Sequence, residues 1–108
     1  MAIGNNIIFL GTELKLNINI APMGVVSMDD YDFNIDVYTQ SSNKHLIIEK
    51  AETKKVDKDN YVVIIDTELV GAGRVMCKVT AYLPDGDFKD RDRKEIAVVD
   101  TGISIVKI

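Results

Sequence analysis

Leu14–Ile20 reads Leu-Lys-Leu-Asn-Ile-Asn-Ile, an unbroken alternation of apolar and polar residues. Successive side chains of a β-strand point to opposite faces, so this stretch places leucine and isoleucine on one face and lysine and asparagine on the other. A strand of this kind is typical of an antiparallel sheet that lies on a core on one side and in water on the other. Tyr31–Val37 repeats the pattern, with an apolar residue at every odd position. Together the two stretches indicate an all-β fold.

Turn-forming residues divide the rest of the chain into short runs about 8–12 residues apart, a spacing typical of sandwiches and barrels. The runs predict strands at Ile7–Leu10, Leu14–Ile20, Tyr31–Thr39, Leu46–Glu49, Tyr61–Ile65, Val75–Leu83, Ile96–Val99 and Ile103–Ile108. Tyr61–Ile65 is apolar on both faces, which predicts a central place in its sheet. Asp100-Thr101-Gly102 predicts a turn between the last two strands, and the charged segment Glu52–Asn60 predicts a crossing through solvent.

Seven to eight short strands in 108 residues fit one antiparallel, immunoglobulin-like β-sandwich that spans residues 1–108. A small barrel is the competing architecture. The chain has one cysteine and no tryptophan, so it lacks the Cys-Trp-Cys marker of antibody domains. The expected likeness to immunoglobulins is therefore one of architecture alone.

The net charge of −4 argues against electrostatic binding of nucleic acid and against an anionic membrane surface as partner. A single cysteine cannot form an internal disulfide, so the fold needs no oxidising compartment. No lysine or arginine precedes the short apolar run Ile7–Leu10, which makes the N-terminus a poor signal peptide. We expect a protein that is made in the cytoplasm, a prediction that leaves its final place of action open.

The sequence contains no recognisable catalytic signature. His45 is the sole histidine and follows a polar loop, and no Gly-x-Ser-x-Gly nucleophile motif is present. Cys77 falls on the apolar face of its predicted strand, where burial disfavours the reactive thiolate. The expectation is a protein that is not an enzyme and binds no cofactor.

An acidic loop is the strongest candidate for metal chemistry. Its four carboxylates could supply oxygen ligands to calcium, and they belong to Asp85, Asp87, Asp90 and Asp92. The spacing departs from that of an EF-hand, and four bases interleave with or follow the acids: Lys89, Arg91, Arg93 and Lys94. A solvated hairpin loop is the competing interpretation.

Three aromatic residues are candidates for a ligand-binding surface: Tyr38, Tyr82 and Phe88. The alternation places them at solvent-facing or loop positions, which suits stacking on a glycan. The apolar ends of the chain, Ile7–Leu10 and Ile103–Ile108, predict strands at sheet edges. An uncovered edge can pair with another chain, whereas packing within the same domain would satisfy it internally.

The order of these signals resembles a known class of viral proteins. The segments that carry the resemblance are Phe9–Leu16, Met28–Phe33, Asp59–Val63, Leu69–Gly73 followed by Arg74, and Leu83–Phe88 with Arg93 after it. They are similar to small immunoglobulin-like virion proteins of tailed phages and prophages of gut bacteria. Their layout is also similar to the N-terminal immunoglobulin-like domain of phage baseplate upper proteins.

This resemblance implies a non-catalytic structural protein of a tail or baseplate type, without cofactor or active site. It would act through repeated contacts with other virion proteins or with copies of itself as a homo-oligomer, and would end in a virion. The alternative is a β-sandwich module that binds a glycan or another ligand.

Overall fold

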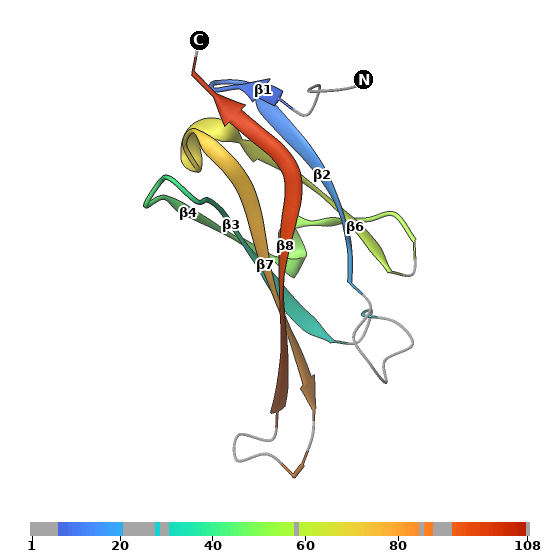
Figure 1. Cartoon of the computed structure of the whole chain (residues 1–108). Helices are drawn as coiled ribbons and strands as arrows, with labels where there is room; N and C mark the ends of the chain where they lie inside the picture. Colours follow the sequence, from blue (N-terminus) through green and yellow to red (C-terminus); the bar gives the residue numbers. More distant parts are fainter. Residues whose placement is uncertain are drawn as a thin grey trace.

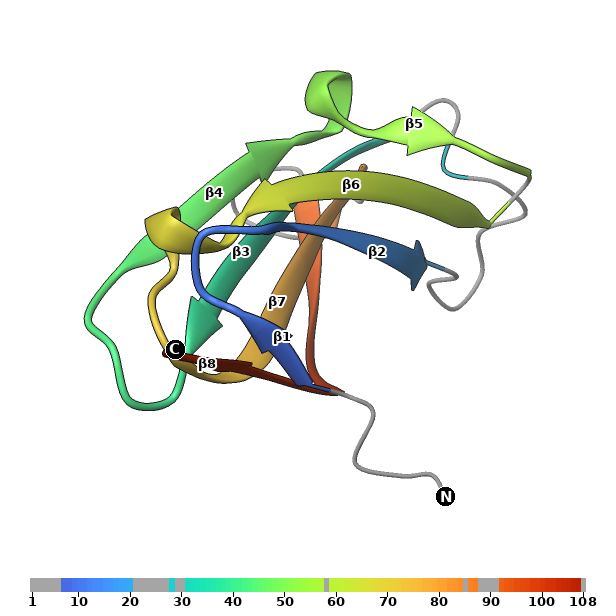
Figure 2. The same ribbon diagram turned by 90° about the horizontal axis from the view of Figure 1, so that it is seen from above.

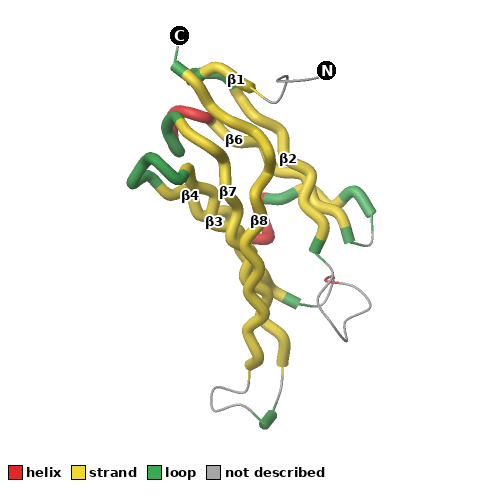
Figure 3. The backbone as a smooth tube through the Cα atoms, in the orientation of Figure 1, coloured by secondary structure: helices red, strands yellow, loops and turns green. Residues whose placement is uncertain are grey.

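The computed structural model describes residues 7–20, 28, 31–57, 59–84, 86–87 and 92–107, with the backbone alone at residue 92. Most of this part of the chain is strand, and it also contains two short 3₁₀ turns, η2 (Lys50–Glu52) and η3 (Thr67–Leu69) (Figure 3). The all-β prediction is confirmed. No helix in these residues is long and apolar enough to cross a membrane.

The larger sheet has five strands. In spatial order they are β1 (Ile7–Phe9), β8 (Asp92–Val106), β7 (Gly73–Pro84), β3 (Asp32–Thr39) and β4 (His45–Glu49). β1 runs parallel to β8, and the remaining pairs are antiparallel. The sheet is therefore mixed, which corrects the prediction of purely antiparallel pairing. β7 and β8 extend beyond the other strands as a long twisted hairpin, and the molecule measures 50 × 28 × 23 Å (Figure 1).

The smaller sheet has three strands, in the order β2 (Glu13–Asn19), β6 (Asn60–Asp66) and β5 (Lys54–Lys55). It lies over the larger sheet, so that the molecule has two layers (Figure 2). The described strands thus form two separate sheets in a sandwich-like arrangement and do not close into one barrel.

The core lies between the two layers and is built by the predicted alternation. On β2, Leu14 and Leu16 are buried while Lys15 and Asn17 are exposed. On β3 the fully buried apolar side chains are Phe33, Ile35 and Val37. Aliphatic residues dominate the rest of the core cluster, as the composition predicts.

The largest correction concerns the end of the chain. The sequence predicts two strands, Ile96–Val99 and Ile103–Ile108, with a turn between them, but residues 96–99 and 103–106 lie on the single strand β8. The register shifts there: Arg74 lies opposite Ser104, whereas Met76 lies opposite Asp100. Two steps along β7 therefore correspond to four along β8, and the extra residues form an irregularity within the strand.

Hydrogen bonds hold this irregularity in place. The Thr101 hydroxyl donates to the Val75 carbonyl at 2.9 Å, and the Gly102 amide donates to the Asp100 carboxylate at 2.9 Å. Gly102 has φ = 76°, a conformation that glycine adopts easily. Asp100, Thr101 and Gly102 are residue types common in turns, but in this structure they form an irregularity within a continuous strand.

Two smaller differences concern β5 and β6. Residues 54–55 pair with β6, so the segment Glu52–Asn60 is not wholly a crossing in solvent. β6 occupies the centre of its sheet, as its apolar run predicts, but Ile64 is 56% exposed because no other layer of the described residues covers the outer face.

Candidate functional site

The acidic loop lies mostly outside the described residues. Asp85 and Asp90 are not described, and neither is the side chain of Asp92; Asp87 is exposed in a turn. The described residues contain no group of three or more histidine, cysteine, aspartate or glutamate side chains that could hold a metal. Calcium binding by the loop stays a prediction.

His45 is exposed at the first position of β4, and its Nδ1 lies 2.9 Å from Oδ1 of Asp36 on β3. Its ring also stacks on Tyr38, with centroids 5.0 Å apart. Cys77 is 1% exposed, and burial raises the pKa of its thiol to about 11, with a smaller contribution from the charge of Asp36. The prediction that Cys77 packs in the core is confirmed.

Two of the predicted aromatic candidates, Tyr38 and Tyr82, lie far apart on the larger sheet. Tyr38 and Tyr82 are both half-buried, but Tyr38 pairs with Met76 whereas Tyr82 pairs with Asp32. Residues 32 and 38 are separated by about 20 Å along a strand. Tyr82 also accepts a hydrogen bond from the Asn34 amide at 3.0 Å. Phe88 lies outside the described residues, so ligand binding by these aromatics stays a prediction.

A different feature emerges along β8, where exposed aliphatic side chains gather. Ile96 is 54% exposed, Val98 is 57% exposed and Val99 is 45% exposed. Ile96 and Val98 lie opposite Thr80 and Lys78 on the outer face of the sheet. Val99 lies on the inner face, beside a part of the strand that the smaller sheet leaves uncovered. Both faces of this segment therefore present apolar surface.

The backbone edge of the same segment is open in the described part of the chain. β1 is the strand that borders β8 on this side, and it pairs only with residues 104–106. The irregularity at residues 101–103 separates this covered end from residues 92–100. No described strand pairs with residues 96–100 on this side, and amide and carbonyl groups at such an edge can bond an added strand. We call residues 94–100 the open β8 edge.

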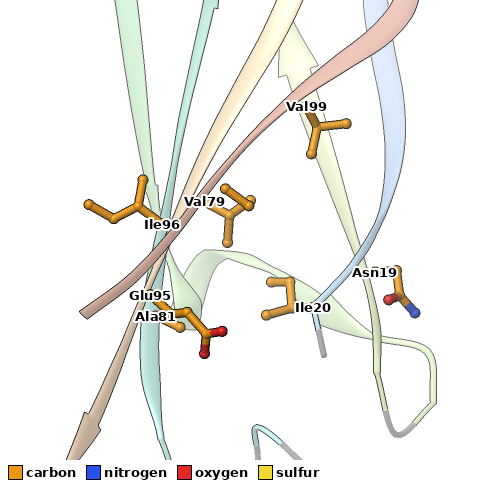
Figure 4. Close-up of a pocket in the computed structure, with 8 residues that line it drawn as sticks. Asn19, Ile20, Val79, Ala81, Glu95, Ile96 and Val99 are labelled. Atoms are coloured by element: carbon orange, nitrogen blue, oxygen red, sulfur yellow. The ribbon is translucent and has the colours of Figure 1, made fainter. Parts of the chain in front are cut away.

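A hollow of about 290 Å³ runs beside the open β8 edge (Figure 4). Val79, Ala81 and Val99 line it from the larger sheet, and Ile20 lines it from the segment that follows β2. A second hollow of about 470 Å³ continues between Leu16 and Ile18 of β2 and Ile103 of β8. β2 is itself the outermost strand of its sheet, so two strand edges face each other across an apolar groove.

Opposite charges stand at the two ends of the open β8 edge. Lys94 is exposed, and its ammonium lies 5.7 Å from the Tyr82 ring centroid. Asp100 is also exposed and accepts two hydrogen bonds of 2.8 Å from Nε of Arg74. The Arg74 guanidinium and the Gly102 amide lower the pKa of the Asp100 carboxyl below its ordinary value of 3.8. The carboxylate therefore keeps its charge at neutral pH.

The sequence placed a strand at Ile96–Val99 but did not identify it as a binding surface. The sequence does contain one relevant signal, because residues 96–99 are apolar at four consecutive positions. A strand of this kind has apolar side chains on both faces, and one of these faces stays exposed unless another layer covers it. Comparison of the chain with models of protein families, with curated proteins and with solved structures gives no match.

Proposed function

We propose that this protein is a non-catalytic interaction module that binds protein partners through the open β8 edge. The observation that carries the proposal is that Ile96, Val98 and Val99 are all half-exposed along a strand edge with no neighbour in the described part of the chain. Such an edge is a template for strand addition, in which backbone hydrogen bonds give affinity and the side chains give selectivity.

The edge strands β2 and β4 differ from the open β8 edge in a way that supports β8 as the binding surface. Natural proteins guard exposed edges with charged or polar side chains and with short strands. β2 follows this rule, since its exposed positions are Glu13, Lys15, Asn17 and Asn19. β4 exposes one large aliphatic residue, Ile47, between His45 and Glu49. The open β8 edge is as long as β2 and longer than β4, and its centre is apolar.

We also propose that the fold is immunoglobulin-like. Assigning β2 to β8 in chain order to strands B, C, C′, D, E, F and G gives one sheet of B, E and D, and another of G, F, C and C′. These are the sheet memberships of immunoglobulin-type sandwiches. β1 would then be the first strand, added beside G.

The resemblance in sequence pattern to virion proteins of tailed phages extends this proposal to a biological role. A particle component must make the same contact many times, and an exposed apolar strand edge suits repeated contacts. We therefore propose a structural role in a phage or prophage assembly, with virion proteins as the partners.

Site-specific photo-crosslinking tests the interaction module. A photoreactive amino acid is placed at Val98 in one variant and at Ile64 in a matched control, because these residues are 57% and 56% exposed on different sheets. In cells that assemble the particle, we expect defined protein adducts from position 98 and none from position 64. Adducts in equal yield from both positions, or none from position 98, would contradict the proposal. Mass spectrometry of the adducts then tests the virion role.

A further inference from the structure

The outer face of the open β8 edge has a self-complementary pattern. Its residues are Lys94, Ile96, Val98 and Asp100, which pair with Tyr82, Thr80, Lys78 and Met76 of β7. Along the strand this reads as a positive charge, two aliphatic side chains and a negative charge. Reversal of the direction exchanges the two charges and leaves the aliphatic centre in place.

From this pattern we propose that two copies of the protein pair their open β8 edges antiparallel, about a two-fold axis at Ala97. The inference rests on the proposed function and names its partner as a second copy. The two larger sheets would join into one continuous sheet, and the interface would be isologous.

The pairing rules of antiparallel strands select this register. Residues directly opposite each other share a face, so a two-fold axis perpendicular to the sheet must lie midway between the strands where a residue faces its own copy. With the axis at Ala97, Lys94 lies opposite the partner's Asp100 and Ile96 lies opposite the partner's Val98. Each of these contacts occurs twice.

Neighbouring registers are worse on the same outer face. An axis at Ile96 places Lys94 opposite the partner's Val98, and an axis at Val98 places Asp100 opposite the partner's Ile96. Each sets a charge against an aliphatic side chain. An axis at residue 95 sets Glu95 against its own copy, and like charges directly opposite each other are unfavourable. On the outer face, charge complementarity therefore favours the axis at Ala97 over these registers.

The bond between Arg74 and Asp100 is compatible with this interface. A carboxylate offers about four lone-pair sites, so Asp100 can accept from Nε of Arg74 and also from a lysine of the second copy. The 2.8 Å contacts to Arg74 fix the carboxylate at the end of the strip. On the hollow side of the strand, the same pairing would bring Val99 opposite the partner's Glu95.

Charge exchange between two variants tests the pairing. Lys94→Glu gives an edge with two negative ends, and Asp100→Lys gives an edge with two positive ends. Each variant alone repels its own copy, so we expect the dissociation constant measured by sedimentation equilibrium to rise by about tenfold or more. An equimolar mixture has opposite charges at both ends and should recover dimers of wild-type affinity.

A second pair of variants covers the case in which Asp100→Lys disturbs Arg74 and the fold. Val98→Lys should abolish the dimer, whereas Ile64→Lys, at a position of equal exposure, should leave it intact. Amide hydrogen exchange of wild type should also slow within residues 92–100 as protein concentration rises.

The outcomes separate this inference from the proposed function. A wild-type protein that is monomeric at all concentrations, or a dimer that tolerates both Lys94→Glu and Val98→Lys, overturns the pairing proposed here. If position 98 still crosslinks to a different protein in that case, the interaction module survives and only its partner changes. A monomer without any adduct from position 98 contradicts both.

Discussion

Phe33 and Tyr61 join the two sheets through their rings, whose centroids are 4.8 Å apart and whose planes meet at 59°. Phe33 lies on β3 of the larger sheet and Tyr61 lies on β6 of the smaller one, and both are buried. A tilted ring pair of this kind contributes beyond the area it buries. The chain has three phenylalanines and no tryptophan, so this contact is a large part of its aromatic core.

We therefore expect Phe33→Ala to lower the free energy of unfolding by about 3–5 kcal/mol, the usual cost of removing a buried phenylalanine ring. Urea unfolding followed by circular dichroism measures the loss. Ile64→Ala is the control, since Ile64 is 56% exposed and should change stability by about 0.5 kcal/mol or less. Equal losses in the two variants would mean that the sheets are not held together at Phe33.

Gly73 begins β7 at a crowded and strained position, with φ = 134°. A side-chain methyl there would collide with the Ser41 hydroxyl and approach the Thr39 Cβ at 3.1 Å. We expect Gly73→Ala to destabilise the protein by about 2 kcal/mol or more, because strain and overlap add. Thermal unfolding of this variant measures the effect.

Gly102 provides the matched control for Gly73. Its φ is also positive, at 76°, but a methyl there meets nothing within 4 Å. Gly102→Ala should therefore cost only the backbone strain, about 1 kcal/mol. Adding Ser41→Gly to Gly73→Ala should recover part of the loss. A larger effect at Gly102 than at Gly73 would show that overlap is unimportant.

The strand faces could be read from the sequence because alternation depends only on neighbouring residues. Leu14, Leu16 and Ile20 and the odd positions of residues 33–37 are buried as expected for this reason. The pairing of Ile7 with Ser104 could not be read, because it joins the two ends of the chain and local patterns carry no information on distant partners.

The same limit applies to the candidate site. Asp100-Thr101-Gly102 has the residue types of a turn, and only the positions of Met76 and Val75 on the neighbouring strand make it an irregularity within β8. Val98 looks like an ordinary strand residue in sequence. Its exposure follows from its place on the outer face of the larger sheet, which no other layer of the described residues covers, and this is a property of the assembled sheet.

The bond between Arg74 and Asp100 should make stability depend on pH. The pKa of Asp100 is lower in the folded protein than its ordinary value of 3.8, so the folded state favours the ionised form. This contribution is complete above the unfolded pKa and disappears as pH falls through the folded value. Asp100→Asn should be less stable than wild type at pH 7, and the gap should close below about pH 4.

Urea unfolding of both proteins between pH 7 and pH 3 measures that gap. Both side chains are exposed, so added salt should also narrow it by screening. The measurement is made at protein concentrations low enough to exclude association, since Asp100 also belongs to the proposed dimer contact. A gap that stays constant over this pH range would rule out an ionic origin.

Cys77 should be unreactive in the folded protein. Its pKa rises from 9.0 to about 11, which lowers the thiolate fraction near neutral pH by about a hundredfold. Its 1% exposure adds a steric barrier. A colourimetric disulfide reagent should therefore label Cys77 rapidly in denaturant and very slowly in buffer. Rapid labelling in buffer would show that the open side of the sandwich exposes β7.

Thr67 connects the β1–β2 turn to the end of β6 through a single buried hydroxyl. Its Oγ1 accepts from the Gly11 amide at 2.9 Å and donates to the Thr12 carbonyl at 2.6 Å. Thr67→Val preserves the shape but leaves both backbone groups without this partner, so we expect a loss of about 1–3 kcal/mol in unfolding free energy. Thr67→Ser keeps the hydroxyl and loses only a methyl, and should cost about 1 kcal/mol. If the serine variant is the less stable of the two, packing of the methyl group and not the two hydrogen bonds secures this turn.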